Sequence, residues 1–253
     1  MNSEDVKPYN ETEAKGKQVG EMFDAIAPAY DSMNTMMTGG LHIRWRNKAL
    51  KMASRMLPPE GPKMALDVAC GTGDVSFRLH ELFPKAYITG LDLSAGMLKI
   101  AKEKLAGMDI AAQNHITFIE GDSLNMPFPD ETFDLVTVAY GVRNFEHLEE
   151  GYREMHRVMK PGGVICVIEL SEPANALIRG FYRLYSHHVI PAVGKMVSHD
   201  TRAYSYLPES IAACPQRGEM TAMMERAGFK DATFKSLTMG VVTIYLGRRS
   251  RKS

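Results

Sequence analysis

The sequence has little cysteine, with three residues in 253, far apart and without a C-x-x-C pair: Cys70, Cys166 and Cys214. This scarcity argues against a disulfide framework and against a cysteine zinc site, and it is typical of proteins in a reducing cytoplasm. The histidines clustered late in the chain, His187, His188 and His199, are expected at the surface or in a pocket lining. No metal site is therefore predicted.

An excess of charge of either sign is also missing, since 30 basic residues balance 30 acidic ones. A neutral chain has no overall field that would gather nucleic acid, so no nucleic-acid partner is expected. The local exception is the basic stretch 248–253. Such a stretch is usually solvated, although it could also touch an anionic lipid surface.

Long hydrophobic runs are absent. No stretch approaches the roughly 18 to 20 apolar residues that span a bilayer, and residues 1–20 have no apolar segment typical of a signal peptide. The prediction is a cytoplasmic protein, with the inner face of the membrane as the place of any peripheral contact.

The composition that remains, 45% hydrophobic and 24% charged, is that of a globular protein. The polar residues 1–18 are predicted to be flexible until a partner orders them, and residues 19–253 to form a single domain. Helices are expected over 19–57, with a break at Thr38-Gly39-Gly40, before a proline-rich linker at 58–62.

From residue 64 onward, apolar strand patterns alternate with helical ones. Strands are predicted at 64–69, 87–91, 115–120, 133–140 and 163–170, and helices at 74–83, 95–105 and 148–159. This alternation predicts a doubly wound α/β fold. After a helical insertion at 172–216 and a helix at 218–227, two late β runs at 232–237 and 241–246 predict an antiparallel hairpin at the edge of a mostly parallel, seven-stranded sheet.

The first strand ends in a glycine-rich turn, Cys70-Gly71-Thr72-Gly73. A strand that leads through such a turn into a helix lets backbone N–H groups approach a ligand closely, although a G-x-G by itself is equally typical of a tight turn. The third glycine of the dinucleotide fingerprint is replaced by Ser76.

Acidic residues follow the next two strands. Asp92, followed by Leu93, is placed to accept the hydroxyls of a ribose; its alternative role is a charge at a helix N-terminus, where Ser94 already provides a cap. Asp122 and Ser123 are placed to accept an adenine amine, the alternative being an Asx turn. Three such features at successive strand ends favour a ligand site.

The motif D-x-A-x-G-T-G-D at 67–74, the acidic strand end and G-D-x-x-x-x-P-F at 121–128 together resemble class I S-adenosylmethionine methyltransferases. A dinucleotide requires glycines around its pyrophosphate, whereas a methionine tail requires acceptors for its ammonium group, such as Asp67. This chemistry favours S-adenosylmethionine as the cofactor, bound by Asp67, Gly71, Thr72, Gly73, Asp92, Leu93, Asp122 and Ser123.

Longer segments resemble the ubiquinone/menaquinone biosynthesis C-methyltransferases over roughly residues 19–246. They are the signatures at 30–45 and 157–171, the G-V-R-N segment at 141–144, and A-Y-S-Y-L-P-E-S at 203–210. Departures are Thr38 for a usual Ser, Cys214 for a usual Phe, and Ala139 where some members have a Ser that touches the cofactor. The Ala139 contact is not carried over.

The resemblance implies methylation of a ring carbon of demethylmenaquinol, a polyprenylated quinol, or of the corresponding ubiquinone precursor. It also implies transient contact with a membrane surface, and it leaves a homodimer open. Nothing in this chemistry requires a metal, because the donor's sulfonium is already activated.

The candidate catalytic residues are Arg143, Asn144, His42, Tyr206 and Asp31. Arg143 is placed to stabilise a naphtholate oxygen, or else to form a salt bridge with Glu146 or Glu169. His42 and Trp45 either line a quinol pocket or anchor the N-terminal helices. The base that removes the quinol proton is Asp31, His42, Tyr206 or a water held by Arg143.

Two other classes stay open. One is a nicotinamide-dependent oxidoreductase, which Ser76 at the third glycine position disfavours. The other is a non-catalytic protein of the same fold that binds an adenosine ligand, which the retained Arg143 and Asn144 disfavour.

Overall fold

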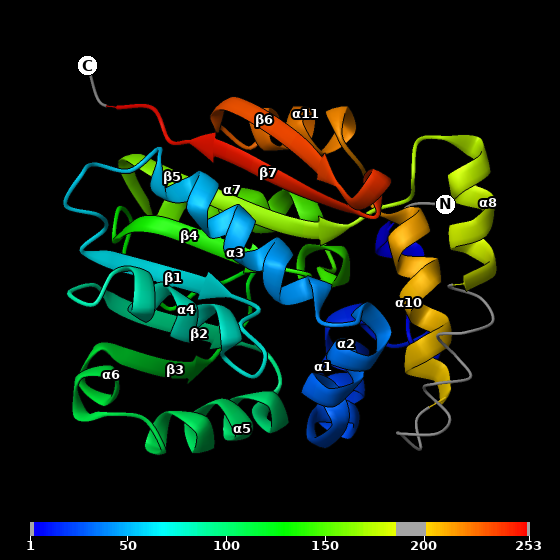
Figure 1. Cartoon of the computed structure of the whole chain (residues 1–253), viewed down its shortest axis with the longest axis horizontal. Helices are drawn as coiled ribbons and strands as arrows, with labels where there is room; N and C mark the ends of the chain where they lie inside the picture. Colours follow the sequence, from blue (N-terminus) through cyan, green and yellow to red (C-terminus); the bar gives the residue numbers. More distant parts are fainter. Residues whose placement is uncertain (1–2, 186–200, 252–253) are drawn as a thin grey trace.

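The computed structural model describes residues 3–185 and 201–251, and within these residues the strands form one seven-stranded sheet (Figure 1). The sheet order is β3-β2-β1-β4-β5-β7-β6. The strands are β1 (Met64–Val68), β2 (Tyr87–Asp92), β3 (Ile116–Glu120), β4 (Phe133–Ala139), β5 (Met159–Leu170), β6 (Lys230–Leu237) and β7 (Val242–Arg248).

Strands β1 to β5 are parallel, and β7 pairs antiparallel with both β5 and β6. The predicted mostly parallel sheet and late hairpin are therefore confirmed. The register aligns the carboxyl ends of the parallel strands: Val68 lies opposite Leu91 and Val138, and Asp92 lies opposite Glu120. The loops that follow β1 to β4 consequently meet along one edge of the sheet, where ligands of open α/β sheets bind.

Helices cover both faces of the sheet. Each strand contributes side chains to both of the resulting cores, because alternate strand residues point to opposite sides. Along β5, Cys166 packs in the cluster that contains Trp45 and Leu50, whereas Val167 packs in the cluster that contains Tyr152 and Met220. Helices α3 (Leu41–Ser54), α4 (Asp74–Leu82) and α5 (Ala95–Ala106) contribute to the first cluster; α7 (Leu148–Val158) and α11 (Gly218–Arg226) contribute to the second. In Figure 1, α3 lies in front of the sheet.

The N-terminal helices α1 (Lys15–Ile26) and α2 (Tyr30–Thr38) lie beyond the carboxyl ends of the parallel strands (Figure 1). The predicted break before α3 is confirmed, because Gly39 and Gly40 adopt left-handed φ values of 57° and 78°. A second, unpredicted break separates α1 from α2 at the short 3₁₀ turn η2 (Ala27–Ala29), where Pro28 interrupts the helix.

Of the segment 1–18 that was predicted to be flexible, the structure describes residues 3–18. The 3₁₀ turn η1 (Ser3–Asp5) packs inward, and α1 begins at Lys15 rather than near Val19. The Lys15 ammonium is buried and donates to the carbonyls of Ser3 (2.7 Å) and Arg143 (3.0 Å). The sequence pattern suggested solvation because lysine is rarely buried unless it is paired.

Helices α8 (Ala176–Leu184) and α10 (Thr201–Ala213) occupy the predicted insertion between β5 and α11. His187, His188 and His199 lie outside the described residues. Two further differences from the predictions concern the sheet and its crossovers. Helix α6 (Ile110–His115) was not predicted, and β5 begins at Met159, so it includes the Lys160-Pro161-Gly162 segment that was expected to precede it. None of the helices in the described residues is long and apolar enough to cross a membrane.

Candidate active site

Two adjoining cavities lie at the carboxyl edge of the sheet. The larger has a volume of about 300 Å³ and is walled by α2, α3, α8, α10 and the ends of β1 and β4; this is the lower end of the range for small-molecule sites. The smaller, of about 90 Å³, lies between α1 and the loops after β2 and β3. The cavities share lining residues that include Tyr30, Gly71, Tyr140 and Asn144, so they form one continuous site.

The glycine turn lies where the two cavities meet. Gly71 has φ +56°, and a Cβ there would meet only the Tyr30 ring, at an ordinary contact distance of 3.9 Å. Its N–H donates to the Asp92 carboxylate at 2.7 Å. Gly73 lines neither cavity: a Cβ there would lie 2.7 Å from the Phe118 ring, so this glycine is required for packing against β3.

Two of the predicted acidic residues line the small cavity, together with Leu93 and Ser123. The half-buried Asp92 accepts from the N–H groups of Gly71 and Ser94, and burial raises the pKa of its carboxyl despite these bonds. Asp122 accepts from the N–H of Leu124 at 2.9 Å, so it forms the Asx turn that was its alternative role and also faces the cavity. Ser94 caps α5, as predicted, by accepting from the Met97 N–H.

The third acidic residue, Asp67, lines the large cavity beside the glycine turn. Its oxygens accept from the hydroxyls of Ser76 (2.7 Å) and Thr137 (3.0 Å). Burial raises the pKa of this carboxyl to about 7. The serine that replaces the third glycine of a dinucleotide fingerprint therefore holds this carboxylate in place.

Two residues with strained backbone conformations flank this point. Ala69, after β1, and Tyr140, after β4, have φ values of 51° and 61°, and both line the two cavities. Non-glycine residues in the left-handed region are uncommon and concentrate at functional sites. The strain turns the chain at the ends of two central strands, and the Tyr140 N–H is held by the Ile168 carbonyl at 2.7 Å.

Four residues that line the large cavity each carry a buried polar atom without a hydrogen-bond partner among the described residues: Tyr140 Oη, Arg143 Nε, Asn144 Oδ1 and Tyr206 Oη. Most of the remaining lining is aromatic or aliphatic, including Met33, Trp45 and Leu207. Burial raises the pKa of the Tyr140 and Tyr206 hydroxyls, so both are protonated donors near neutral pH. Unpaired buried polar groups are costly in a folded protein, and here they converge on one cavity. They match a ligand that brings polar oxygens into an apolar site.

Arg143 forms the ion pair that the sequence analysis named as its alternative role. Its guanidinium Nη1 donates to the buried Glu169 carboxylate at 2.8 Å and to the Tyr140 carbonyl. Burial by itself lowers the pKa of Arg143, but Glu169 more than offsets this and the pKa is raised. The charge is therefore retained, and Nε has no hydrogen-bond partner among the described residues.

His42 lies on α3, is buried and lines the large cavity. Its Nδ1 lies 2.7 Å from the Thr38 hydroxyl, which donates to the Asn34 carbonyl at 2.7 Å. Because that hydroxyl has a single proton, Nδ1 is the donor to it and Nε2 carries the free lone pair. Burial and then the charge of Arg46 lower the pKa of His42, so the neutral form prevails at pH 7.

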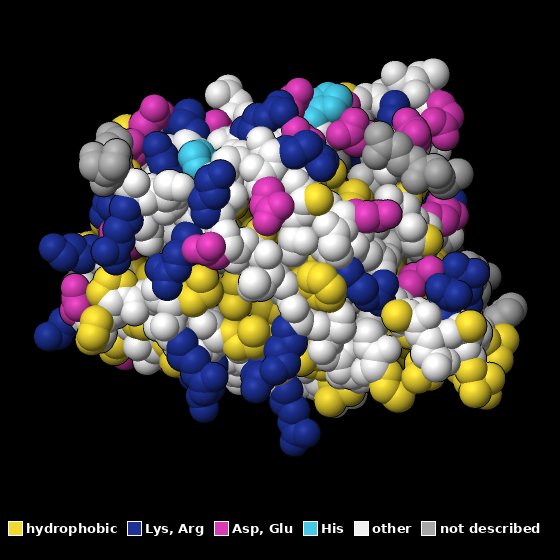
Figure 2. Space-filling view, turned by 90° about the horizontal axis from the view of Figure 1, so that it is seen from above, with side chains coloured by type: hydrophobic (Ala, Val, Ile, Leu, Met, Phe, Trp, Pro, Cys, Tyr) yellow, Lys and Arg dark blue, Asp and Glu magenta, His cyan; other side chains and the backbone are white. Residues whose placement is uncertain are grey.

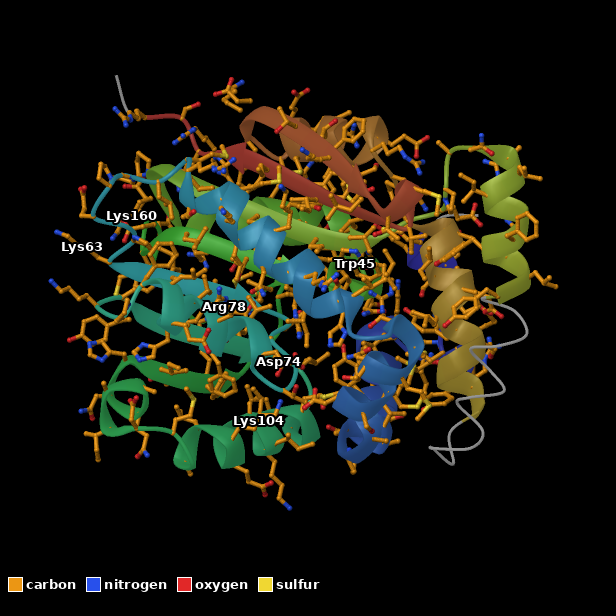
Figure 3. The ribbon with its side chains drawn as sticks, in the orientation of Figure 1. Trp45, Lys63, Asp74, Arg78, Lys104 and Lys160 are labelled. Atoms are coloured by element: carbon orange, nitrogen blue, oxygen red, sulfur yellow. The ribbon has the colours of Figure 1, made fainter. Side chains whose placement is uncertain are left out.

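Asp31 lines neither cavity. Its carboxylate accepts from the Thr72 hydroxyl at 2.7 Å and pairs with Lys104 at 2.6 Å. Lys104 also pairs with Asp74, and Figure 3 shows these two residues next to α2. Asp31 therefore ties α2 to the glycine turn. Within the described residues, no group of three His, Cys, Asp or Glu side chains is arranged for a metal ion.

Several residues of this site were not predicted from the sequence. Tyr30 and Tyr140 line both cavities, and Tyr182 lines the large one. A signal was available for Tyr140, which directly follows a central strand and precedes a glycine. Tyr182 carried no such signal, because the insertion that carries it is brought over the site only by the tertiary fold.

Comparison with solved structures identifies the fold. A methyltransferase from Thermotoga maritima, described as S-adenosylmethionine-dependent, has a TM-score of 0.61 at 16% identity and covers 91% of this chain and 99% of its own. Phosphoethanolamine N-methyltransferase 2 of Haemonchus contortus, solved with S-adenosyl-L-methionine, also has a TM-score of 0.61, at 15% identity, covering 85% and 57%. The fold is that of the class I methyltransferases.

Comparison with sequences identifies the family. The model of the ubiE/COQ5 methyltransferase family matches residues 11–249. A demethylmenaquinone methyltransferase from Porphyromonas gingivalis is 42% identical, covering 96% of this chain and 98% of its own. A ubiquinone/menaquinone biosynthesis C-methyltransferase from Syntrophotalea carbinolica is 41% identical, covering 93% and 95%.

The fold and the family together define this protein as an S-adenosylmethionine-dependent methyltransferase. More narrowly, the chain belongs to the ubiE/COQ5 methyltransferase family. The predicted class, fold and methyl donor are thereby confirmed, and the nicotinamide-dependent alternative is not supported.

The placement of the donor's ribose at Asp92 is a prediction that binding measurements can check. We expect Asp92→Ala to weaken S-adenosylmethionine binding at least about tenfold, because a hydrogen bond to a charged group contributes about 1.5–3 kcal/mol. Isothermal titration calorimetry would measure the affinity. Asp92→Asn, which keeps an acceptor for the Gly71 N–H, and the melting temperature without donor separate lost binding from a loosened turn. Full affinity in a folded Ala variant would place the nucleoside elsewhere.

Proposed function

We propose that this methyltransferase converts demethylmenaquinol to menaquinol, by methylating a ring carbon next to a hydroxyl-bearing one. The observation that carries the proposal is the set of four unpartnered polar atoms on residues that line the apolar large cavity. A quinol has two hydroxyl oxygens on a flat apolar ring, which is the chemistry that this set complements. The names of the relatives from P. gingivalis and S. carbinolica agree with a quinone-pathway acceptor.

The residues around the small cavity fit S-adenosylmethionine. Gly16 and Gly20 on α1 line it together with Leu93, and the Asp92 and Asp122 carboxylates on the same cavity can accept from the hydroxyls and the amine of an adenosine. The methionine end would lie toward Gly71 and Asp67, where the cavities join. When bound, the donor supplies an electrophilic methyl group on its sulfonium.

Three donors and one acceptor would hold the quinol. Tyr140 Oη, Tyr206 Oη and Arg143 Nε can donate to its oxygens, and Asn144 Oδ1 can accept from a hydroxyl. Because Arg143 keeps its charge through Glu169, its N–H stabilises the oxygen more strongly as negative charge develops on it. Exclusion of water by the surrounding aromatic side chains strengthens this interaction further.

Among the four candidate bases, His42 fits best. Asp31 lies outside both cavities, Tyr206 is a protonated donor, and a water held by Arg143 is a much weaker base than a neutral imidazole. The Nε2 of His42 would take the proton of one quinol hydroxyl, which makes the neighbouring ring carbon nucleophilic. That carbon forms a bond with the methyl group as the sulfur–methyl bond breaks, and the ring then loses the proton of the methylated carbon to regain aromaticity.

The proposal predicts that only the reduced acceptor reacts, because a quinone ring is electron-poor and has no hydroxyl proton to lose. We expect methyl transfer from radiolabelled S-adenosylmethionine to demethylmenaquinol under anaerobic conditions, and none to demethylmenaquinone. The corresponding benzoquinol, run in parallel, tests the ubiquinone-type alternative. Equal rates with oxidised and reduced acceptors would contradict the mechanism, and faster transfer to the benzoquinol would reassign the substrate.

A further inference from the structure

The rim of the large cavity is apolar on the outside of the molecule as well as inside. Leu41 and Tyr185 line the cavity and are also exposed, so the cavity opens between the start of α3 and the end of α8. The Tyr185 hydroxyl donates to the Met37 carbonyl at 2.7 Å, which ties α8 to α2 at this opening.

Helix α8 presents an apolar stripe to solvent beside this opening. Leu177, Phe181 and Leu184 recur at the four- and three-residue spacing of one helix face, and they are 72%, 68% and 60% exposed. Tyr182, on the neighbouring face, lines the cavity. Ile43 and Met239 extend the exposed apolar surface onto α3 and the turn η5 (Thr238–Gly240). Soluble proteins seldom expose apolar side chains in such a group without a binding role.

Helix α3 presents a basic stripe that runs away from the same opening. Arg44, Lys48, Lys51 and Arg55 recur at spacings of four, three and four residues, on the side opposite the buried Trp45 and Ala49. None of the four forms an ion pair with a described residue, and α3 contains no Asp or Glu. In a chain whose net charge is zero, this stripe is a local concentration of unneutralised positive charge.

The two stripes lie on the same side of the molecule. Figure 2 views it from above, so the α3 side of the sheet forms the lower edge; basic side chains project along this edge, and hydrophobic ones gather toward its right end, the side on which α8 lies in Figure 1. Apolar side chains beside unpaired basic ones are the pattern of surfaces that bind an anionic bilayer, where the apolar groups enter the headgroup region and the cations stay at the surface.

We propose that the apolar stripe of α8 and the basic stripe of α3 form a docking surface for an anionic lipid bilayer, which places the opening of the large cavity against the membrane. The inference rests on the proposed function in one respect, since a polyprenylated quinol resides in the bilayer and must enter through this opening. Charge complementarity selects the partner: an anionic surface neutralises the α3 stripe, whereas a second copy of the chain would bring an equal positive charge.

The test is cosedimentation of the whole chain with vesicles, without quinol. We expect binding to phosphatidylcholine vesicles that contain phosphatidylglycerol and weak binding to phosphatidylcholine alone. Lys48→Glu with Lys51→Glu should lower the affinity at least about tenfold, because each basic residue near an anionic surface contributes about fivefold. Leu177→Gln with Phe181→Gln should lower it by a similar factor.

Matched controls come from the distant end of the sheet. Lys99→Glu with Lys102→Glu makes the same charge change on the exposed face of α5, and Ile110→Gln removes an equally exposed apolar side chain from α6. Both control proteins should bind vesicles as the wild type does. Equal losses in the controls, or equal binding to neutral and anionic vesicles, would overturn the proposal. So would failure to bind vesicles together with a dimer that the α8 variant dissociates, which would make this face a protein interface.

A second readout separates this proposal from the proposed function. With a demethylated quinol that lacks a long tail, dissolved in buffer, the α3 and α8 variants should keep wild-type turnover, because none of the changed residues lines either cavity. With a long-tailed quinol in anionic vesicles they should be at least about tenfold slower. Vesicle binding without any quinol methylation would refute the substrate alone, and methylation of both quinols without vesicle binding would refute the docking surface alone.

Discussion

Replacement of His42 by glutamine should lower kcat with the quinol by about 10²–10⁴-fold, the usual contribution of a positioned general base. The structure places a neutral imidazole in the cavity wall with its Nδ1 proton held by Thr38, which leaves Nε2 free to accept a proton. Donor affinity, measured by calorimetry, should stay unchanged, because His42 does not line the small cavity.

The pH dependence of kcat gives a second measurement of the same role. Because burial and Arg46 lower the pKa of His42, its neutral form, and with it kcat, should be retained at neutral pH and decline in acid, with the midpoint below the ordinary value of 6.5. The carboxyl of Asp67, with a pKa of about 7, titrates nearby. An acid limb that survives in His42→Gln would therefore belong to Asp67, and His42 would not be the base.

The matched control for His42 is Thr38→Val, which keeps the side-chain volume but removes the hydroxyl that selects the tautomer. We expect an intermediate loss of about tenfold in kcat, because the ring remains but its Nδ1 proton is no longer held. A Thr38 variant as impaired as His42→Gln would indicate that the two residues only anchor the N-terminal helices. An unchanged melting temperature in both Thr38→Val and His42→Gln would argue against a role in anchoring these helices.

Arg143→Ala should have the largest effect on stability as well as a large effect on catalysis. It leaves the Glu169 carboxylate buried without its partner, and breaking a buried ion pair costs about 3–5 kcal/mol. Loss of a donor to the developing oxyanion should lower turnover by about a hundredfold or more. Arg143→Lys should recover only part of each, since lysine supplies the charge without the planar fork.

A double variant separates these two effects. Arg143→Met combined with Glu169→Gln removes both charges and keeps an acceptor for the Leu170 N–H, which bonds to Glu169 at 2.8 Å. Denaturant unfolding should show that this double variant regains most of the free energy of unfolding lost in Arg143→Ala, because it contains no unpaired buried charge. Turnover should stay low. If turnover returned together with stability, Arg143 would be a structural partner of Glu169 only.

The sequence by itself determined the features that arise from neighbouring residues. The alternation of apolar strands with amphipathic helices predicted the parallel sheet, since each element carries its own period of hydrophobicity. The strand, glycine turn and helix at 64–83 placed Gly71 at the carboxyl edge, and Asp92 and Asp122 followed at the ends of the next two strands. Parallel strands bring such ends together whatever the rest of the chain does, which is why this side of the site could be predicted.

The sequence predicted where the site residues lie better than it predicted what they do, because their roles depend on contacts with distant segments. Gly73 was predicted to bind the cofactor, and only the fold shows that it is also needed for close packing against Phe118, 45 residues further along the chain. Asp31 was a candidate base but is held by Thr72 and Lys104, from the turn after β1 and from α5. A carboxylate in a sequence does not reveal its partner, because the free energy of ionisation depends on charges and burial that only the folded chain provides.

The tertiary structure alone decided which polar atoms on the acceptor side are left without a partner. Asn144 and Tyr206 were named from the family resemblance, but only the fold brings them together with Tyr140, from a strand end, a 3₁₀ turn and the helical insertion. Lys15 likewise reaches the Arg143 carbonyl across 128 residues of sequence. These contacts arise where helices from distant parts of the chain pack over the edge of the sheet, and no local sequence pattern encodes that packing. Their energies depend on which polar atoms are left without water or a partner, and that is fixed only when distant segments close over the cavity.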